Sequence, residues 1–222
     1  TRELALQILE DLKCFSGNSK ISFSCVIGGI NQNSQIRKNS QGIDVLVAAP
    51  GRLLDLINQG HIRLDQTEFL VLDECDRLLD MGFLPDVKRI IKTMPKKRQS
   101  LLFSATIPEE VRQFSREILS KPDRIDIAPK NIAAPKINQY SYKVTGTQKP
   151  SALRTLLRFP EVRRAIVFTR TKHRADKVSR MLNSSGFLVE VIHGNKSQNA
   201  RQRALSNFKE GKAWILVATD VA

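Results

Sequence analysis

The chain has 222 residues, with 36 Lys and Arg against 22 Asp and Glu and a formal net charge of +14. Hydrophobic residues make up 41% of it, enough to bury a core, which excludes a disordered protein. No apolar run approaches the roughly 18 residues of a membrane span, no signal peptide opens the chain, and three scattered cysteines do not make a disulfide framework or a zinc site. We therefore expect a reducing, cytoplasmic setting and no membrane partner.

The positive charge is concentrated in the second part of the chain. Residues 1–129 contain 18 Lys and Arg and 17 Asp and Glu, a net of +1, whereas residues 130–222 contain 18 and 5, a net of +13. This asymmetry indicates two units with different tasks, the second facing a polyanion. A generally basic surface without such a partner explains the same counts, so charge alone leaves both interpretations open.

Short runs rich in Val, Leu, Ile and Phe alternate with amphipathic stretches along most of the chain. Near-continuous apolar strands separated by helices are typical of a parallel sheet covered on both faces, so the expected fold class is α/β. In the first part, the expected strands cover residues 22–27, 45–49, 69–72 and 101–104, and the expected helices cover 4–12, 52–59, 86–93 and 109–119.

A stretch over residues 128–138 interrupts this alternation. It has two prolines, small residues and no periodicity, as is typical of a linker. The sequence therefore predicts two α/β units, residues 1–128 and 138–222, joined by a linker over 129–137. In the second unit, the expected strands cover residues 139–144, 165–169, 187–192 and 214–218, and the expected helices cover 151–157, 172–183 and 199–209.

Three carboxylates, Asp73, Glu74 and Asp76, follow the apolar strand predicted over 69–72. In open α/β sheets, ligands bind just outside the carboxyl ends of the strands. An Asp at that place is a hard oxygen ligand for a hydrated Mg²⁺ on nucleotide phosphates, and a neighbouring Glu can orient or deprotonate a water molecule. The alternative is an acidic helix N-terminus stabilised by the helix dipole. The pattern favours nucleotide chemistry.

The residues around this cluster resemble motif II of the DEAD-box ATP-dependent RNA helicases, with Cys75 in place of the usual alanine. The stretches 168–176 and 192–204 are most similar to the bacterial RhlE-type subgroup. Further stretches resemble other family motifs in the expected order. They are Thr1–Ala5 for motif Ia, Gly28 and Gly29 for the double glycine, Ala49–Arg52 for motif Ib, Ser104–Thr106 for motif III, Ile166–Phe168 for motif IV, Gln198 and Arg201 for the Q-x-x-R element, and Val217–Ala222 for the start of motif V.

The resemblance implies RNA duplex unwinding or remodelling driven by Mg-ATP hydrolysis, with two RecA-like parallel-sheet domains. The chain begins inside motif Ia, ends inside motif V and has no G-x-x-x-x-G-K-[ST] sequence. Residues 1–128 are therefore expected to be the C-terminal part of the first, ATP-binding domain, and 138–222 the N-terminal part of the second, both incomplete. ATP and Mg²⁺ are the implied cofactors. Structured or duplex RNA, bound largely without sequence preference, is the implied partner of a monomer.

The resemblance also implies a role for each motif residue. Asp73 positions Mg²⁺ through water and Glu74 activates the hydrolytic water, while Asp76 contacts Ser104 or Thr106 and links the nucleotide site to RNA. Without the family, the two hydroxyls belong to an ordinary turn after a strand, and a glycine pair is a turn as well. The residues implied to contact RNA are Arg2, Gly28, Gly29, Gly51, Arg52, Gly194, Gln198, Arg201 and Thr219.

Two other functions stay open at this stage. A chain without the P-loop can be a catalytically inactive, basic RNA-binding module. A DNA-directed superfamily 2 translocase is the other alternative, and the D-E-C-D and S-A-T sequences disfavour it.

Ala49 stands where the family usually has threonine, so one hydroxyl contact to phosphate is expected to be missing. His193 is interpreted as a structural histidine and not as a general base. Aromatic residues are sparse, at 6%, which argues against base stacking.

Overall fold

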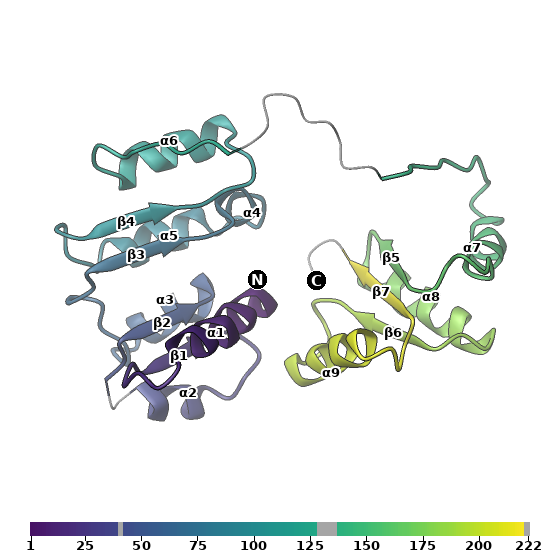
Figure 1. Ribbon diagram of the computed structural model, residues 1–222, viewed down its shortest axis with the longest axis horizontal. Coiled ribbons are helices and arrows are strands. Elements are labelled where there is room, and N and C mark those ends of the chain that lie inside the picture. Colours follow the sequence, from purple (N-terminus) through teal and green to yellow (C-terminus); the bar gives the residue numbers. More distant parts are fainter. Residues whose placement is uncertain (40–41, 128–136, 220–222) are drawn as a thin grey trace. The chain divides into compact units, whose positions relative to one another are not determined.

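The computed structural model describes residues 1–39, 42–127 and 137–219 (Figure 1). The chain divides into two compact units, Thr1–Ala128 and Pro129–Ala222, which are described separately. The predicted linker over 129–137 falls almost entirely outside the described residues, as do the last three residues of the stretch that resembles motif V. In the described part of the chain, no helix is long and apolar enough to cross a membrane.

The first unit contains two pairs of parallel strands, β1 with β2 and β3 with β4. Helix α1 packs on β1 and β2, and α3 packs on α5 (Figure 1). The elements are α1 (Arg2–Ser16), β1 (Phe23–Val26), α2 (Gln32–Asn39), β2 (Val45–Ala48), α3 (Pro50–Asn58), β3 (Phe69–Leu72), α4 (Cys75–Asp80), α5 (Leu84–Ile91), β4 (Gln99–Leu102) and α6 (Glu109–Ile118).

Two hydrophobic clusters form the core of the first unit. One joins Val26 of β1 to Leu53 and Leu56 of α3, and the other joins Leu72 of β3 to Phe114 of α6. Burying a side chain of this size contributes roughly 1.5–3 kcal/mol to folding. Packing against these helices therefore holds the ends of the two strand pairs in position, and predicted site residues lie at those ends.

The second unit has one parallel sheet in the order β5-β7-β6, with β7 in the middle. Ile215 and Val217 of β7 pack in a cluster with α7 and α8, whereas Leu216 and Ala218 pack against α9. Strand β7 is consequently buried on both faces, as predicted. The elements are α7 (Lys149–Leu157), β5 (Ala165–Thr169), α8 (Lys172–Ser184), β6 (Val189–Ile192), α9 (Gln198–Lys209) and β7 (Ile215–Thr219).

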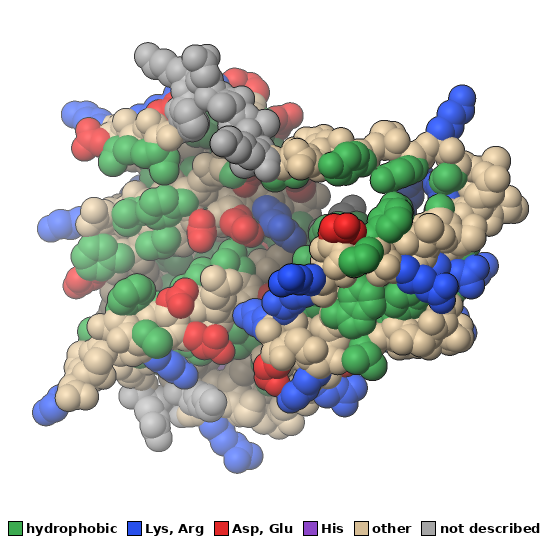
Figure 2. All heavy atoms as spheres, turned by 45° about the vertical axis from the view of Figure 1, so that its right-hand side comes forward, with side chains coloured by type: hydrophobic (Ala, Val, Ile, Leu, Met, Phe, Trp, Pro, Cys, Tyr) green, Lys and Arg blue, Asp and Glu red, His purple; other side chains and the backbone are tan. Residues whose placement is uncertain are grey.

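The α/β class and the parallel sheets are confirmed, but three details of the prediction are wrong. Residues 139–143 are exposed, Val144 is half-buried, and the stretch pairs with no described strand. Helices α2 and α4 were not predicted. Strands β3 and β5 are covered on one face only. Successive side chains of a strand point to opposite faces of the sheet, and on one face of these two strands the side chains are exposed. The exposed residues are Phe69 and Val71 in β3 and Ile166 and Phe168 in β5. Figure 2 shows hydrophobic side chains, in green, at the surface.

Candidate functional site

Asp73 and Glu74 lie directly after β3, where the chain turns sharply into α4. Glu74 has φ 50° and ψ 49°, a left-handed conformation that is uncommon for a residue with a side chain. Its amide donates a hydrogen bond of 2.8 Å to Oδ1 of Asp73, and its carboxylate lies 3.9 Å from Nε of Arg77. Strain of this kind persists only where the surroundings hold the residue in place, and it is frequent at active sites.

Asp76 connects this turn to the residues that follow β4. Its Oδ2 accepts hydrogen bonds of 2.8 Å from both the amide and the hydroxyl of Thr106. Its own amide donates to Oγ of Ser104 at 3.1 Å, and that hydroxyl donates to the carbonyl oxygen of Thr106 at 2.6 Å. The structure therefore brings Asp76, Ser104 and Thr106 together as one network.

The network stabilises Asp76 as an anion. Burial raises the pKa of its carboxyl, but the hydrogen bonds from Thr106 and from the amide of Arg77 outweigh burial and hold this pKa below its ordinary value. A negative charge is thus fixed between the ends of β3 and β4, whose parallel pairing puts both carboxyl ends at one edge of the sheet (Figure 1).

The carboxylate of Asp73 has the chemistry required for a magnesium site. It is exposed beyond the end of β3, and it is a hard oxygen ligand. Among the described residues, no group of three or more His, Cys, Asp and Glu is arranged to hold a metal ion. The exposed carboxylate of Asp73 fits Mg²⁺, which usually takes one or two protein carboxylates and completes its coordination with water and substrate phosphates.

Cys75, the departure from the usual motif, is fully buried in the core beneath the acidic turn. Its thiol lies 3.8 Å from the carbonyl oxygen of Leu72, and burial together with the charges of Asp73 and Asp76 raises its pKa to about 12. At this pKa only about one thiol in 10⁴ is ionised at pH 8. The cysteine therefore fills the place of a small apolar residue without offering a nucleophile.

We predict that Cys75 is protected from thiol reagents in the folded protein. With Ellman's reagent at pH 8, exposed Cys14 is expected to react within seconds, whereas Cys75 reacts only after unfolding in guanidinium. Cys25, half-buried and with its pKa raised by burial to about 11, should react slowly. A Cys14→Ser variant assigns the fast phase, and rapid labelling of Cys75, located by mass spectrometry, would contradict the packing described here.

The double glycine follows β1 and is held by a residue that the sequence analysis did not single out. Gln35 of α2 is 5% exposed; its Oε1 accepts from the amide of Ile27 at 3.0 Å, and its Nε2 donates to the carbonyl oxygen of Ile27 at 3.2 Å. Gly29 has φ 79°, a conformation that favours glycine. Gln35 lies in a polar segment, so the sequence carries no signal for this contact.

Gly51 and Arg52 lie in the first turn of α3, directly after β2. Ala49 is the N-cap and makes no side-chain capping hydrogen bond, as the absence of a hydroxyl requires. Nε of Arg52 lies 3.7 Å from Asp55, and its Nη1 is buried without a hydrogen-bond partner among the described residues. The amide of Ala49 donates to Val26 of β1, so the glycine pair and α3 begin at the same edge of this sheet.

Arg2 begins α1 and is half-buried. In the second unit, Gly194 follows β6 and is exposed, while Thr219 ends the neighbouring strand β7 and is buried. Gln198 and Arg201 lie in the first turns of α9 and are 0% and 2% exposed. Both side chains are buried in the structure, and their contact with RNA stays a prediction.

His193 lies beside Gly194, at the centre of a polar network. It is 2% exposed, its Nδ1 accepts from the amide of Asn195 at 3.3 Å, and its Nε2 lies 3.2 Å from Asp176 of α8. Asp176 also pairs with Lys196 at 3.0 Å. Hydrogen bonds from Lys196 and, with a smaller effect, from His193 lower the pKa of the Asp176 carboxyl. These contacts tie the glycine loop to α8, and the structural role of His193 stays a prediction.

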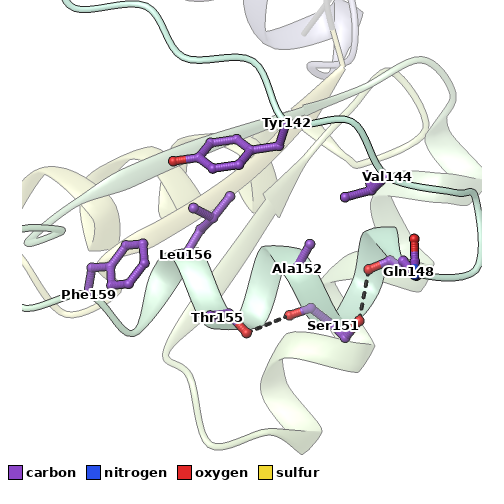
Figure 3. A pocket seen from close by; sticks show the side chains of 8 residues that line it. All are labelled: Tyr142, Val144, Gln148, Ser151, Ala152, Thr155, Leu156 and Phe159. Carbon is purple, nitrogen blue, oxygen red and sulfur yellow. Dashed lines mark hydrogen bonds between the residues drawn. The ribbon is translucent and has the colours of Figure 1, made fainter.

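A separate cavity of about 380 Å³ lies on the second unit, between α7 and the extended segment before it. Figure 3 shows Tyr142, Leu156 and Phe159 around it, with hydroxyls of Ser151 and Thr155 bonded to backbone carbonyls of the helix. None of the predicted site residues lines this cavity.

The chain is similar to known proteins over both of its units. Residues 1–114 match the DEAD/DEAH box helicase family and residues 148–222 the helicase conserved C-terminal domain. Over the whole chain, the ATP-dependent RNA helicase CshA of Listeria monocytogenes is 43% identical, and the chain spans 43% of that relative. The DEAD-box ATP-dependent RNA helicase 40 of rice is 41% identical, with 28% of its length spanned.

Solved structures also match this chain. A Saccharomyces cerevisiae Dbp5 structure bound to RNA and ADP BeF3 matches 99% of this chain and 56% of its own, with a TM-score of 0.86 and 29% identity. A DEAD box protein of Methanococcus jannaschii matches 100% of this chain and 59% of its own, with a TM-score of 0.56 and 34% identity. The RhlE-type subgroup stays a prediction. The acidic turn and its hydrogen-bond network therefore lie in a chain that belongs to the DEAD/DEAH box helicase family.

Proposed function

We propose that this chain is part of an ATP-dependent RNA helicase, which remodels RNA duplexes by hydrolysing Mg-ATP. The observation that carries this proposal is the network of Asp76 with Ser104 and Thr106, because it connects the acidic turn after β3 to the segment after β4. The relatives that are named as ATP-dependent RNA helicases support it. Residues 1–128 and 138–222 are assigned to parts of two RecA-like domains joined by a linker over 129–137, in a monomeric, cytoplasmic protein.

The acidic turn is assigned the chemistry of hydrolysis. Asp73 would hold Mg²⁺ through water, and the ion, when bound, neutralises charge on the phosphates of ATP. Glu74 would orient the attacking water and accept its proton. Its left-handed backbone fixes the direction in which the side chain leaves β3, so the carboxylate is positioned before the substrate arrives.

The two glycine-bearing strand ends are assigned to RNA. Backbone amides at Gly28, Gly29 and Gly51, with the guanidinium of Arg52, suit phosphate oxygens and carry no sequence preference. Arg2 would add positive charge near them. In the second unit, exposed Gly194 has the corresponding role. Gln198, Arg201 and Thr219, which are buried in the structure, are assigned to the same RNA-binding region of the second unit.

We predict that Gly28→Ala and Gly194→Ala weaken RNA binding without altering the fold. A Cβ at either position meets no atom within 4 Å, and neither residue has a positive φ, so the free protein accepts alanine. The methyl groups would instead obstruct close approach of a phosphate. We expect the Kd for single-stranded RNA, measured by fluorescence anisotropy, to rise about tenfold, which corresponds to about 1.4 kcal/mol.

The matched control is Gly146→Ala, which also meets no atom within 4 Å and lies away from the assigned residues. An equal Kd for the three variants would contradict the RNA assignment of Gly28 and Gly194. Gly29→Ala is a less informative variant, because at φ 79° an alanine strains the backbone whether RNA is bound or not.

One experiment separates the proposed helicase from an inactive RNA-binding module. ATP hydrolysis, RNA affinity and RNA duplex displacement are measured for residues 1–222 and for a longer form that contains the sequence around them. Magnesium-dependent, RNA-stimulated hydrolysis and duplex displacement by the longer form support the helicase, whereas RNA binding without hydrolysis in both forms supports the module. Stimulation by DNA in place of RNA would refute the RNA assignment.

A further inference from the structure

A second cavity lies on the first unit, between the start of β4 and the end of α6. It has a volume of about 330 Å³, and its lining includes the three cationic side chains of Lys96, Arg98 and Lys121 and the hydroxyls of Ser100 and Ser120. No carboxylate lines it. We refer to it as the basic pocket.

The cations of the basic pocket differ from several others of the first unit in lacking acidic partners. Seven Lys and Arg residues of this unit have a carboxylate oxygen within 4 Å. Within the described ranges, Lys96, Arg98 and Lys121 have no such partner. Three positive charges around one cavity repel each other, and a bound anion would remove this repulsion.

Arg98, which lines the basic pocket, has one guanidinium nitrogen without a hydrogen-bond partner among the described residues. Its Nη1 donates to the carbonyl oxygen of Pro95 at 2.5 Å, which fixes the guanidinium in the loop before β4. Its Nε is buried and has no hydrogen-bond partner among the described residues. Buried donors are nearly always paired, so an unpaired guanidinium nitrogen beside a cavity indicates an acceptor that binds there.

Lys121 contributes an independent feature. Its backbone has φ 49°, and apart from Glu74 it is the only residue other than glycine in the described ranges with a positive φ. Such a conformation is unfavourable for lysine and persists only where the surrounding structure imposes it. The strained residue lies at the basic pocket, and strained residues are frequent at ligand sites.

The basic pocket is distinct from the acidic site. Gln99 and Ser100 begin β4, whereas Ser104 and Thr106 follow its end. The two sites therefore lie at opposite ends of the strand, about 15 Å apart by the rise per residue of a β-strand. We propose that the basic pocket binds a phosphate group, either of a free phosphate compound or of an RNA backbone. No aromatic side chain lines it, so a base would not be recognised.

The test is calorimetric titration of the 222-residue chain with inorganic pyrophosphate at constant ionic strength, with Lys96→Ala and Lys121→Gly as variants. We expect saturable binding that each variant weakens at least tenfold. Lys121→Gly keeps the result interpretable because glycine suits φ 49°, so this variant should unfold at or above the temperature of the unchanged chain. Lys20→Ala removes an exposed cation elsewhere in the same unit and should leave binding within twofold.

Single-stranded RNA then distinguishes the two phosphate sources. If RNA occupies the pocket, each variant should lower the slope of log K against log salt by about 1, since one phosphate contact is lost. If a free compound occupies it, the slope is unchanged and only pyrophosphate binding falls. The proposal is overturned if the unchanged chain shows no saturable pyrophosphate binding, or if the pocket variants bind pyrophosphate and RNA as Lys20→Ala does.

Discussion

Glu74→Gln is expected to lower RNA-stimulated ATP hydrolysis by about 10²–10⁴-fold in a longer form that contains this chain, because a positioned general base contributes about that much. Glutamine has the same shape but does not accept the proton of the attacking water. RNA and nucleotide affinity should change little, since Asp73 and the phosphate contacts are unchanged. Turnover is measured by phosphate release with saturating RNA.

The matched control is Glu68→Gln. Glu68 is an exposed carboxylate that directly precedes β3, so it lies at the opposite end of the strand from Glu74. Its replacement removes the same charge and should leave turnover within a factor of about two, as expected for a residue outside the chemistry. Near-normal turnover in Glu74→Gln would show that another group activates the water.

The second large effect is expected from Asp76→Ala. The substitution removes the Oδ2 atom that accepts both Thr106 bonds and leaves the Ser104 hydroxyl with a smaller network. Hydrogen bonds to a charged group contribute roughly 1.5–3 kcal/mol each, and partial exposure of this carboxylate reduces that figure. We expect the first unit to lose about 2–4 kcal/mol of unfolding free energy, and hydrolysis to uncouple from RNA binding.

The distribution of aromatic residues provides a control for this measurement. Trp214 is the only tryptophan and lies in the second unit, where its ring packs 5.4 Å from that of Phe187. Tryptophan fluorescence therefore follows unfolding of the second unit, and hydrogen exchange at the amide of Thr106 follows the first. Asp76→Ala should increase the exchange rate and leave the fluorescence transition unchanged. Asp80→Ala, an exposed carboxylate at the end of the same helix, should do neither.

Acid provides a further test of the same bond network. The pKa of Asp76 is lower in the folded than in the unfolded chain, so its contribution to stability is complete above the ordinary pKa near 4. It is lost as the pH falls below 4 through the folded pKa. The difference in unfolding free energy between the wild-type chain and Asp76→Ala should therefore become smaller as the pH is lowered. A difference that does not depend on pH would contradict the hydrogen-bond network of Asp76.

The strands were predictable because their signal is local. Apolar runs such as 69–72 and 165–169 coincide with β3 and β5, and the acidic turn follows β3 as expected. Helix α4 could not be predicted, since its six residues are too few to display a helical period, and it starts from a strained Glu74. Helix α2 was missed because it is polar on nearly all sides and is held by a buried glutamine.

The other errors depend on tertiary structure. Residues 139–144 have a strand-like pattern, but a strand also requires a neighbour, and none of the described strands pairs with them. Gln198 and Arg201 of the Q-x-x-R element are buried in α9, although glutamine and arginine are usually exposed. Periodicity shows which face of a helix is apolar, but it does not show a polar pair buried within the unit.

The strand order of the second unit has a consequence for how it is made on the ribosome. Strands β5 and β6 do not pair with each other, because β7, which follows both in the chain, lies between them. The first unit instead pairs β1 with β2 and β3 with β4, each of which can form as the chain emerges. At roughly 5–20 residues per second, β5 waits some 3–10 s for its partner. During that time the backbone hydrogen-bonding groups of β5 that later pair with β7 have no partner strand.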